Sequence, residues 1–290
     1  MAQPIRICML NADTPAPTVC AKRASTYGRI FHDLLSNAAT NAKGSTEREI
    51  KIISTDFDVV KNEYPSSLDD FDAVIITGAA ASSYDDRPWI HKLARWTKDT
   101  YENQPRVKIF GSCFGHQLIC QTLLKDYGVK VEKDPNGLEV GVKEIVLHER
   151  FRKTLCNVSG DECSRQGKMR LQFIHRDHVV IPDLQKLPPS WMTVGNTEHC
   201  AVQGLYECGR VLTYQGHFEF DRFVNSETVK FFFPDWQPKV MEETLDAIDA
   251  DDDAIEAARL VLRFFLEQGE SRERSKHVVV EGLPTPLSQG

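Results

Sequence analysis

The sequence lacks any hydrophobic run that approaches the ~20 residues of a membrane-spanning helix. The short apolar stretch near the start, Ile5 to Leu10, is interrupted by Arg6 and is too short for the apolar region of a secretory signal. Both absences favour a cytoplasmic protein with no membrane segment.

An excess of basic residues is also missing. The chain has 35 Lys and Arg against 42 Asp and Glu, which gives a formal net charge of −7. Nucleic-acid binding needs a basic face. We therefore expect no nucleic-acid partner.

Closely paired cysteines are absent as well. The eight cysteines form no C-x-x-C pair, and the spacings Cys156–Cys163 and Cys200–Cys208 do not match the common zinc patterns. Without a secretory signal we expect no disulfides, and most of these thiols are expected to be small buried apolar groups. The sequence thus predicts no metal ion and no cofactor.

The first half of the 290 residues alternates between two kinds of pattern. Apolar runs of strand length lie at residues 5–10, 49–57, 72–78 and 107–112. Apolar residues at helical spacing are found over 22–39, 89–101 and 116–127. The order β-α-β-β-α-β-α predicts an α/β sheet with helices on both faces.

The second half is rich in short strands and ends in helices. Strands are expected at residues 140–147, 171–181, 191–194, 201–206 and 211–215, partly antiparallel, with a loop at 157–168. A helix is expected over 243–268, with an acidic start at Asp251 to Asp253. The predicted domains are residues 1–235 and a helical extension, 236–290, packed on the same domain, with a loosely held end from Pro284.

A G-x-C-x-G sequence ends the fourth of the early strands. In Gly111-Ser112-Cys113-Phe114-Gly115 the cysteine lies at the tip of a sharp turn between strand and helix, like the serine of a nucleophile elbow. The helix N-terminus favours a thiolate there. We interpret Cys113 as a nucleophile rather than as a buried cysteine in a glycine-rich turn.

A histidine and a glutamate follow the apolar strand at 211–215. His217 emerges at the end of that strand, and Glu219, two residues on, shares its side in extended backbone. A carboxylate beside an imidazole can hold its tautomer, as in a catalytic triad. Alone, this pair is more often an unrelated His-x-Glu, but together with the elbow it predicts the base and its orienting group.

With these residues the chain resembles the class I glutamine amidotransferase-like family, in particular the free-standing branch of plant γ-glutamyl peptidases and related fungal proteins. The resemblance rests on the elbow through Gln117, on His217-Phe218-Glu219, and on residues 74–90 and 172–179. It implies a flavodoxin-like three-layer sandwich with a central, mostly parallel sheet. It covers roughly residues 5–220.

The resemblance also implies roles for nine residues. Cys113 would be the nucleophile, His217 the general base and then acid, and Glu219 its orienting group. Backbone N–H groups of Phe114 and of Gly78 or Ala79 would form the oxyanion hole. Gln117, His175 and Asp177 would bind the γ-glutamyl substrate.

The implied activity is hydrolysis or transfer at γ-glutamyl amide bonds through a thioester on Cys113. An alternative is a glutaminase subunit that passes ammonia to a separate synthase partner. A third reading is a catalytically silent binding protein on the same fold. The chain carries Gly78-Ala79 where synthase-feeding relatives commonly have Gly-Gly, and Phe218 where they often have proline, which weakens the second reading.

Overall fold

The computed structural model describes residues 3–41, 50–156 and 167–267. The strands are β1 (Gln3–Asn11), β2 (Ile50–Asp58), β3 (Ala73–Ile76), β4 (Lys108–Ser112), β5 (Lys130–Lys133), β6 (Glu139–Leu147), β7 (Lys168–His175), β8 (Asp177–Val180), β9 (Trp191–Thr193), β10 (Gly195–Asn196), β11 (Leu205–Glu207) and β12 (Val211–Tyr214). The helices are α1 (Pro17–Lys22), α2 (Tyr27–Asn41), α3 (Pro88–Asn103), α4 (Phe114–Leu124), α5 (Glu149–Phe151), α7 (Arg222–Phe232), α8 (Pro238–Ile248) and α9 (Ala254–Leu266). Single helical turns are η1 (Lys125–Tyr127), η2 (Arg152–Cys156) and η3 (Leu184–Lys186).

A seven-stranded sheet forms the centre of the molecule, in the order β2-β1-β3-β4-β12-β11-β9. The first five strands of that order pair in parallel, and β11 pairs antiparallel with both of its neighbours. Two small antiparallel sheets, β10-β6-β7 and β5-β8, come from the second half of the chain. The expected α/β class with a mostly parallel sheet and a partly antiparallel second half is therefore confirmed.

Apolar cores cover both faces of the central sheet. On one face, Phe31 of α2 and Phe264 of α9 share a core with Met9 of β1. On the other face, Leu93 of α3 and Leu118 of α4 share a core with residues such as Val74 of β3. Neighbouring residues of each buried strand point to opposite faces of the sheet. A continuous apolar run therefore gives both faces an apolar surface on which helices pack.

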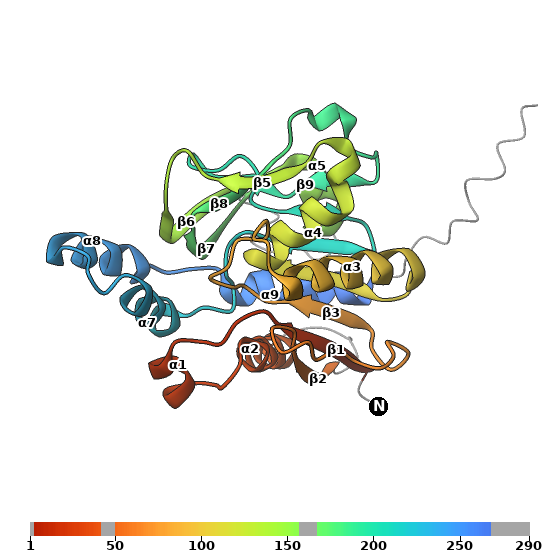
Figure 1. The fold of residues 1–290 in the computed structure, drawn as a ribbon, viewed down its shortest axis with the longest axis horizontal. Coiled ribbons are helices and arrows are strands. Elements are labelled where there is room, and N and C mark those ends of the chain that lie inside the picture. Colours follow the sequence, from red (N-terminus) through yellow and green to blue (C-terminus); the bar gives the residue numbers. More distant parts are fainter. Residues whose placement is uncertain (1–2, 42–49, 157–166, 268–290) are drawn as a thin grey trace, which may run out of the picture.

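The last helices lie in two places. Helices α7 and α8 lie beside β6 and β7 at the left of Figure 1, whereas α9 enters the core together with α2. The predicted boundary between residues 235 and 236 stays a prediction. Within the described residues, no helix is long and apolar enough to cross a membrane.

Two expected helices have different bounds. The helix expected over 22–39 begins at Tyr27, because Oγ1 of Thr26 accepts a hydrogen bond from the N–H of Arg29 and caps it, while 17–22 form α1. The helix expected over 243–268 is α8 and α9, separated at residues 249–253. Asp253 exchanges backbone and side-chain hydrogen bonds with Arg170 of β7, which holds the chain there. The acidic start is confirmed for α9.

The strand expected over 171–181 is two strands. β7 pairs with β6, and β8 pairs with β5, with Arg176 between them. The carbonyl of Arg176 accepts from the N–H of Asp134. No element was expected at β5 or α7. Residues 157–166 of the expected loop and the tail from 271 lie outside the described residues.

Candidate active site

The elbow joins β4 to α4 at Cys113. Cys113 has φ 50° and ψ −105°, a conformation that costs a non-glycine residue about 1–3 kcal/mol. Gly115 lets the turn approach β3, because a Cβ there would lie 2.2 Å from the carbonyl oxygen of Ile76. A Cβ at Gly111 would lie 2.6 Å from the carbonyl carbon of Gly115. The glycines expected for an elbow are therefore required sterically.

Three neighbouring parallel strands bring the candidate groups together. Gly78 follows β3, Cys113 follows β4 and His217 follows β12, and β4 lies between the other two strands. The carboxyl ends of these strands meet at one edge of the sheet, where ligands bind in open α/β sheets. The backbone N–H of His217 also donates to the carbonyl of Gln172 at 2.8 Å, which ties it to β7.

Cys113, His217 and Glu219 lie next to one another. Nδ1 of His217 lies 2.7 Å from Oε1 of Glu219, and the side chains of both are at most 4% exposed. The thiol of Cys113 lies beside the imidazole, and the two line the same cavity. The ring of Phe220 stacks on that of His217, with centroids 4.0 Å apart and an interplanar angle of 18°. The arrangement fixes both the hydrogen bond to Glu219 and the plane of the imidazole.

The charge state of His217 is set by its neighbours. Burial favours the neutral ring, but the negative charges of Glu219 and Cys113 and their hydrogen bonds outweigh it and raise the pKa of His217 to about 10. A positively charged imidazole next to a cysteine is the arrangement that activates cysteine nucleophiles.

Glu219 has a second partner, Ser112. Its Oγ donates to the two carboxylate oxygens at 3.2 and 3.4 Å. Tyr27 stacks on the far side of Phe220, with centroids 5.7 Å apart. Sequence reasoning assigned no role to these three residues. The position of Ser112 directly before Cys113 could have indicated a role for it. Tyr27 is distant in sequence from the other site residues, and Phe220 belongs to no motif.

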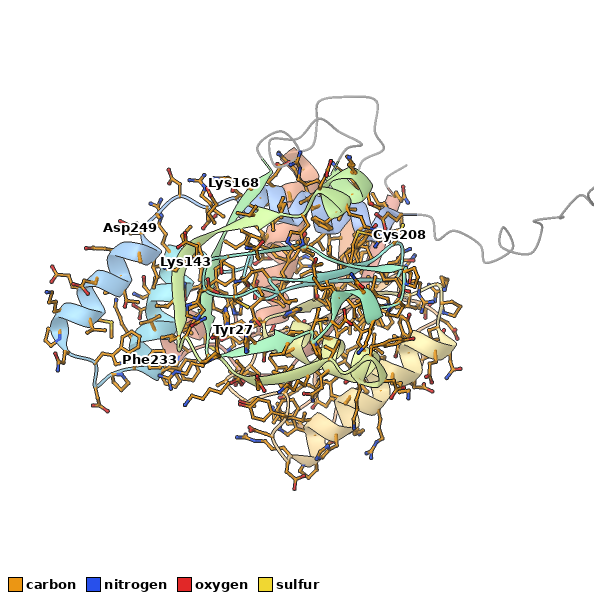
Figure 2. All side chains as sticks on the ribbon, turned by 90° about the horizontal axis from the view of Figure 1, so that it is seen from above. Tyr27, Lys143, Lys168, Cys208, Phe233 and Asp249 are labelled. Carbon is orange, nitrogen blue, oxygen red and sulfur yellow. The ribbon has the colours of Figure 1, made fainter. Side chains whose placement is uncertain are left out.

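A cavity of about 400 Å³ opens over Cys113. Eight of the nine residues singled out from the sequence line it, and the ninth, Phe114, begins α4 directly after Cys113. Figure 2 shows Tyr27 and Phe233, two further lining residues, toward the side of the molecule that carries α7 and α8. The predicted residues are thus brought together at one cavity.

Backbone donors surround the thiol. The first N–H groups of a helix have no intrahelical acceptor, and Phe114 is the first residue of α4. The N–H of Ala80 donates to Asp13 at 2.8 Å, but among the described residues nothing accepts from the N–H of Gly78 or Ala79. These donors are free to bind an oxyanion.

The three predicted substrate-binding residues differ in which of their hydrogen-bonding groups already have partners. Nε2 of Gln117 donates to the carbonyl of Asp177 at 2.9 Å and to Oε1 of Gln215 at 3.0 Å. The carboxylate of Asp177 accepts from Oγ of Ser82 and from the hydroxyl of Tyr84, 3.0 Å away. Asp177 therefore presents a carboxylate in the cavity wall, and within the described part of the chain its side-chain partners are these two hydroxyl groups.

His175 is engaged on both ring nitrogens. Nδ1 lies 2.9 Å from the carbonyl oxygen of Asp177, and Nε2 lies 2.8 Å from Oε2 of Glu139. Burial acts to raise the pKa of Glu139, but the hydrogen bonds and charge of His175, with Thr197 and Gln203, lower it. The contact of His175 with substrate stays a prediction. Its hydrogen bonds are those of a group that positions Asp177.

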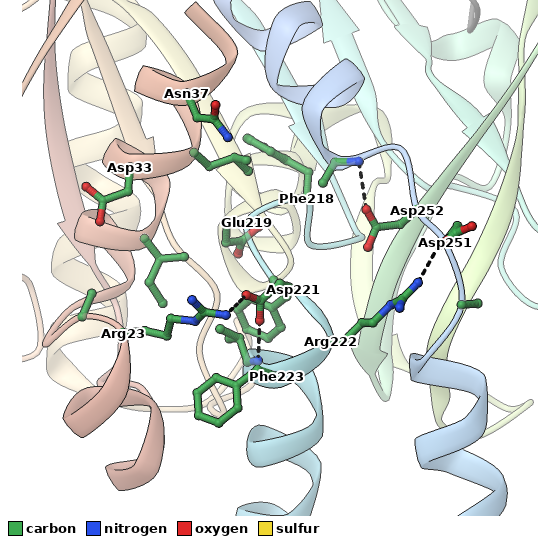
Figure 3. A pocket seen from close by; sticks show the side chains of 17 residues that line it. Arg23, Asp33, Asn37, Phe218, Glu219, Asp221, Arg222, Phe223, Asp251 and Asp252 are labelled. Atoms are coloured by element: carbon green, nitrogen blue, oxygen red, sulfur yellow. Dashed lines mark hydrogen bonds and ion pairs between the residues drawn. The ribbon is translucent and has the colours of Figure 1, made fainter. Parts of the chain in front are cut away.

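A second cavity, of about 750 Å³, lies behind Glu219 and Phe220, which line both cavities. Figure 3 shows Glu219 in its wall. Ion pairs between Arg23 and Asp221 and between Arg222 and Asp251 flank it. Most of the charged side chains that line this second cavity are therefore engaged in ion pairs with one another.

Comparison with known proteins gives a consistent result. A family model for class-I glutamine amidotransferases matches residues 32–233. A glutamine amidotransferase-like protein of Schizosaccharomyces pombe is 32% identical over 77% of this chain and 83% of its own length. Gamma-glutamyl peptidase 2 of Arabidopsis thaliana is 24% identical over 73% of this chain and 80% of its own.

Solved structures agree on the fold. A glutamine amidotransferase from Thermotoga maritima superposes with a TM-score of 0.64 at 15% identity, covering 91% of this chain and 99% of that one. One from Methylobacillus flagellatus has a TM-score of 0.57 at 16% identity, with 91% and 93% covered.

Proposed function

The chain belongs to the class-I glutamine amidotransferase family, and on that premise we propose that it is a cysteine-dependent hydrolase of γ-glutamyl amide bonds that works through a γ-glutamyl thioester on Cys113. The observation that carries this proposal is that Cys113 lies beside His217, which is hydrogen-bonded to Glu219, in the lining of one cavity. Relatives named γ-glutamyl peptidases support the substrate class.

In the first step the Cys113 thiolate attacks the carbonyl carbon of the γ-glutamyl amide. A C–S bond forms, and the electrons of the C=O double bond move to the oxygen. Backbone N–H groups of Phe114 and of Gly78 or Ala79 hold this oxyanion, and each such donor is worth about 3 kcal/mol in comparable sites. The imidazolium of His217 gives its proton to the leaving nitrogen as the C–N bond breaks.

In the second step His217, now neutral, accepts a proton from water. The water oxygen attacks the thioester carbonyl, the C–S bond breaks and Cys113 leaves as the thiolate, so that His217 and Cys113 regain their starting charges. An amine in place of water gives transfer instead of hydrolysis. Glu219, held by Ser112, keeps the imidazole oriented throughout.

The cavity wall supplies the recognition in this proposal. The carboxylate of Asp177 binds the α-ammonium group of the γ-glutamyl moiety, and its hydroxyl partners on Ser82 and Tyr84 hold it in place. Gln117 and His175 fix the backbone carbonyl of Asp177 from two sides. We assign them positioning roles for this carboxylate.

The test is the mass of the intact protein after brief incubation and acid quenching. Glutamine, a γ-glutamyl dipeptide and a glutathione conjugate are each offered to the wild type and to Cys113→Ala. We expect a γ-glutamyl adduct on the wild type alone, with product released from at least one substrate. Unchanged turnover in Cys113→Ala contradicts the thioester. Absence of adduct and product with all three favours the alternative, a glutaminase subunit that requires its synthase partner.

A further inference from the structure

Four side chains with metal-binding atoms meet beside the small sheet β5-β8. Asp134 follows β5, His178 lies in β8, and His199 and Cys200 lie between β10 and β11. One ligand atom from each of Asp134, His178 and Cys200 lies within 4.8 Å of the other two. Nδ1 of His178 and Nε2 of His199 lie 3.4 and 3.6 Å from Oδ2 of Asp134.

The polar atoms of this cluster are only loosely satisfied by the protein. The side chain of Asp134 is 0% exposed. Its Oδ1 accepts from the N–H of Asn136 at 2.8 Å, but Oδ2 has no hydrogen-bond partner among the described residues and is approached by the two histidine nitrogens at ion-pair distance alone. The buried Nε2 atoms of His178 and His199 have no hydrogen-bond partner there either. Buried charges are normally closely paired or bind metals.

We propose that Asp134, His178, His199 and Cys200 bind one Zn²⁺ ion. Thiolate, imidazole and carboxylate are the ligands of zinc in proteins, at bond lengths of about 2.0–2.3 Å. A thiolate and a carboxylate together balance the charge of the ion, and the two imidazoles add none. Ligand atoms around tetrahedral zinc lie roughly 3.3–3.8 Å apart at these bond lengths, so Asp134, His178 and Cys200, within 4.8 Å of one another, must draw closer, and His199 would join them from its place 3.6 Å from Asp134.

The thiol of Cys200 is held for this role. It is buried and makes only a long contact, 3.7 Å, with the carbonyl oxygen of Val202. The thiolate is the form of cysteine that binds metals, so zinc binding here would release the thiol proton.

Four protein ligands make a closed site, which is the form of a structural rather than a catalytic zinc. The ion joins β5, β8 and the segment that contains His199 and Cys200. That segment is tied to the cavity, because the N–H of Cys200 donates to Oγ1 of Thr197, which donates to Glu139, the partner of His175. His178 directly follows Asp177. Zinc thus fixes the wall of the cavity that carries Asp177.

The test uses the untagged full chain, loaded with Zn²⁺ and freed of excess metal. Bound zinc is counted by elemental analysis and by native mass spectrometry, and Co²⁺ is then substituted to look for the thiolate-to-cobalt charge-transfer band. We expect about one ion per chain and the thiolate band. No stoichiometric zinc and no thiolate band in the wild type overturn the proposal without any variant being needed.

Variants identify the ligands. Cys200→Ser and His178→Ala should each weaken zinc binding at least about 100-fold, more than the 10–100-fold of an outer-shell change. The control is Cys208→Ser, because Cys208 is exposed in the turn after β11 and is not among the side chains of the cluster. It should bind like the wild type. Equal zinc in all four proteins would mean that the ion binds elsewhere on the chain, and contradicts the proposal.

A stability measurement separates loss of binding from loss of folding. Zinc that binds only the native state raises the midpoint of thermal unfolding. The rise should appear in the wild type and in Cys208→Ser and be absent in Cys200→Ser, whose folding is checked by circular dichroism. A rise of the same size in Cys200→Ser contradicts the assignment. None of these readouts depends on turnover of a γ-glutamyl substrate.

Discussion

Gly78 is in direct contact with the ring of His217. A Cβ placed on Gly78 would lie 2.8 Å from Cε1 of His217 and 3.6 Å from Cβ of Cys113. The end of β3 therefore sets how closely the imidazole can approach the thiol.

Gly78→Ala should reduce kcat strongly, because the imidazole must move away from its hydrogen bond to Glu219 and its place beside Cys113. A shift of about 1 Å at a catalytic group can cost about 100-fold. Steady-state kinetics measure this loss. Ser66→Ala, at an exposed position between β2 and β3 that does not line the cavity, is the control and should keep its activity. An unchanged kcat in Gly78→Ala would mean that the added methyl group does not displace the imidazole of His217.

Replacing Cys113 should reveal the strain at the elbow. Cys113→Ala retains a Cβ at φ 50°, whereas Cys113→Gly removes it. Glycine usually costs about 0.5–1 kcal/mol relative to alanine. Here we expect the reverse, with Cys113→Gly more stable than Cys113→Ala by roughly 1 kcal/mol. Urea unfolding of the two variants measures the difference, and a less stable glycine variant would show an unstrained turn.

Glu219→Gln should shift the alkaline limb of the pH profile. The charge of Glu219 helps to raise the pKa of His217 to about 10, so imidazolium is present below that pH and is lost as the pH rises through it. Without the charge, the loss of activity should begin at lower pH. The profile of kcat/KM for the wild type and the variant measures this shift.

The same substitution has a consequence for stability. The raised pKa of His217 contributes stability that is full below about 6.5, its ordinary value, and is lost as the pH rises toward 10. Glu219→Gln should flatten this decline in unfolding experiments between these pH values. If neither the alkaline limb of the kcat/KM profile nor the decline of stability with pH changes, Glu219 does not act on the imidazole. Alkylation of Cys113 by iodoacetamide verifies that the thiol remains reactive.

Asp177→Asn should raise KM more than it lowers kcat. The change removes the negative charge from the cavity wall while leaving the shape nearly unchanged. A charge-assisted hydrogen bond contributes about 1.5–3 kcal/mol, so we expect kcat/KM to fall roughly 10–100-fold. Glu132→Gln, at an exposed ion pair of β5, is the matched control. An unaltered KM for all three substrates would remove Asp177 from recognition.

The sequence predicted the parts of this molecule that local patterns determine. The elbow follows from glycines two residues on either side of Cys113, and His217 follows from a short apolar strand. Continuous apolar runs identified the parallel strands. The family resemblance stated from these residues is confirmed by the match over residues 32–233.

Features set by long-range contacts escaped prediction. The expected strand is divided into β7 and β8 at Arg176 because its two halves pair with different strands. The apolar alternation over 171–181 does not indicate this division. The cluster around Asp134 joins three segments with no short spacing, so the search for paired cysteines had no means of finding it. The stacking of Tyr27 on Phe220 likewise joins residues that are far apart in the sequence.

The position of β12 has a consequence for biosynthesis. β12 inserts between β4 and β11, so the sheet is continuous only after residue 214 has left the ribosome. Until then, a nascent chain carries the Cys113 elbow without His217 or Glu219. Contacts so distant in sequence form slowly. The order of synthesis therefore keeps the thiol without its base until the last strand of the central sheet has been made.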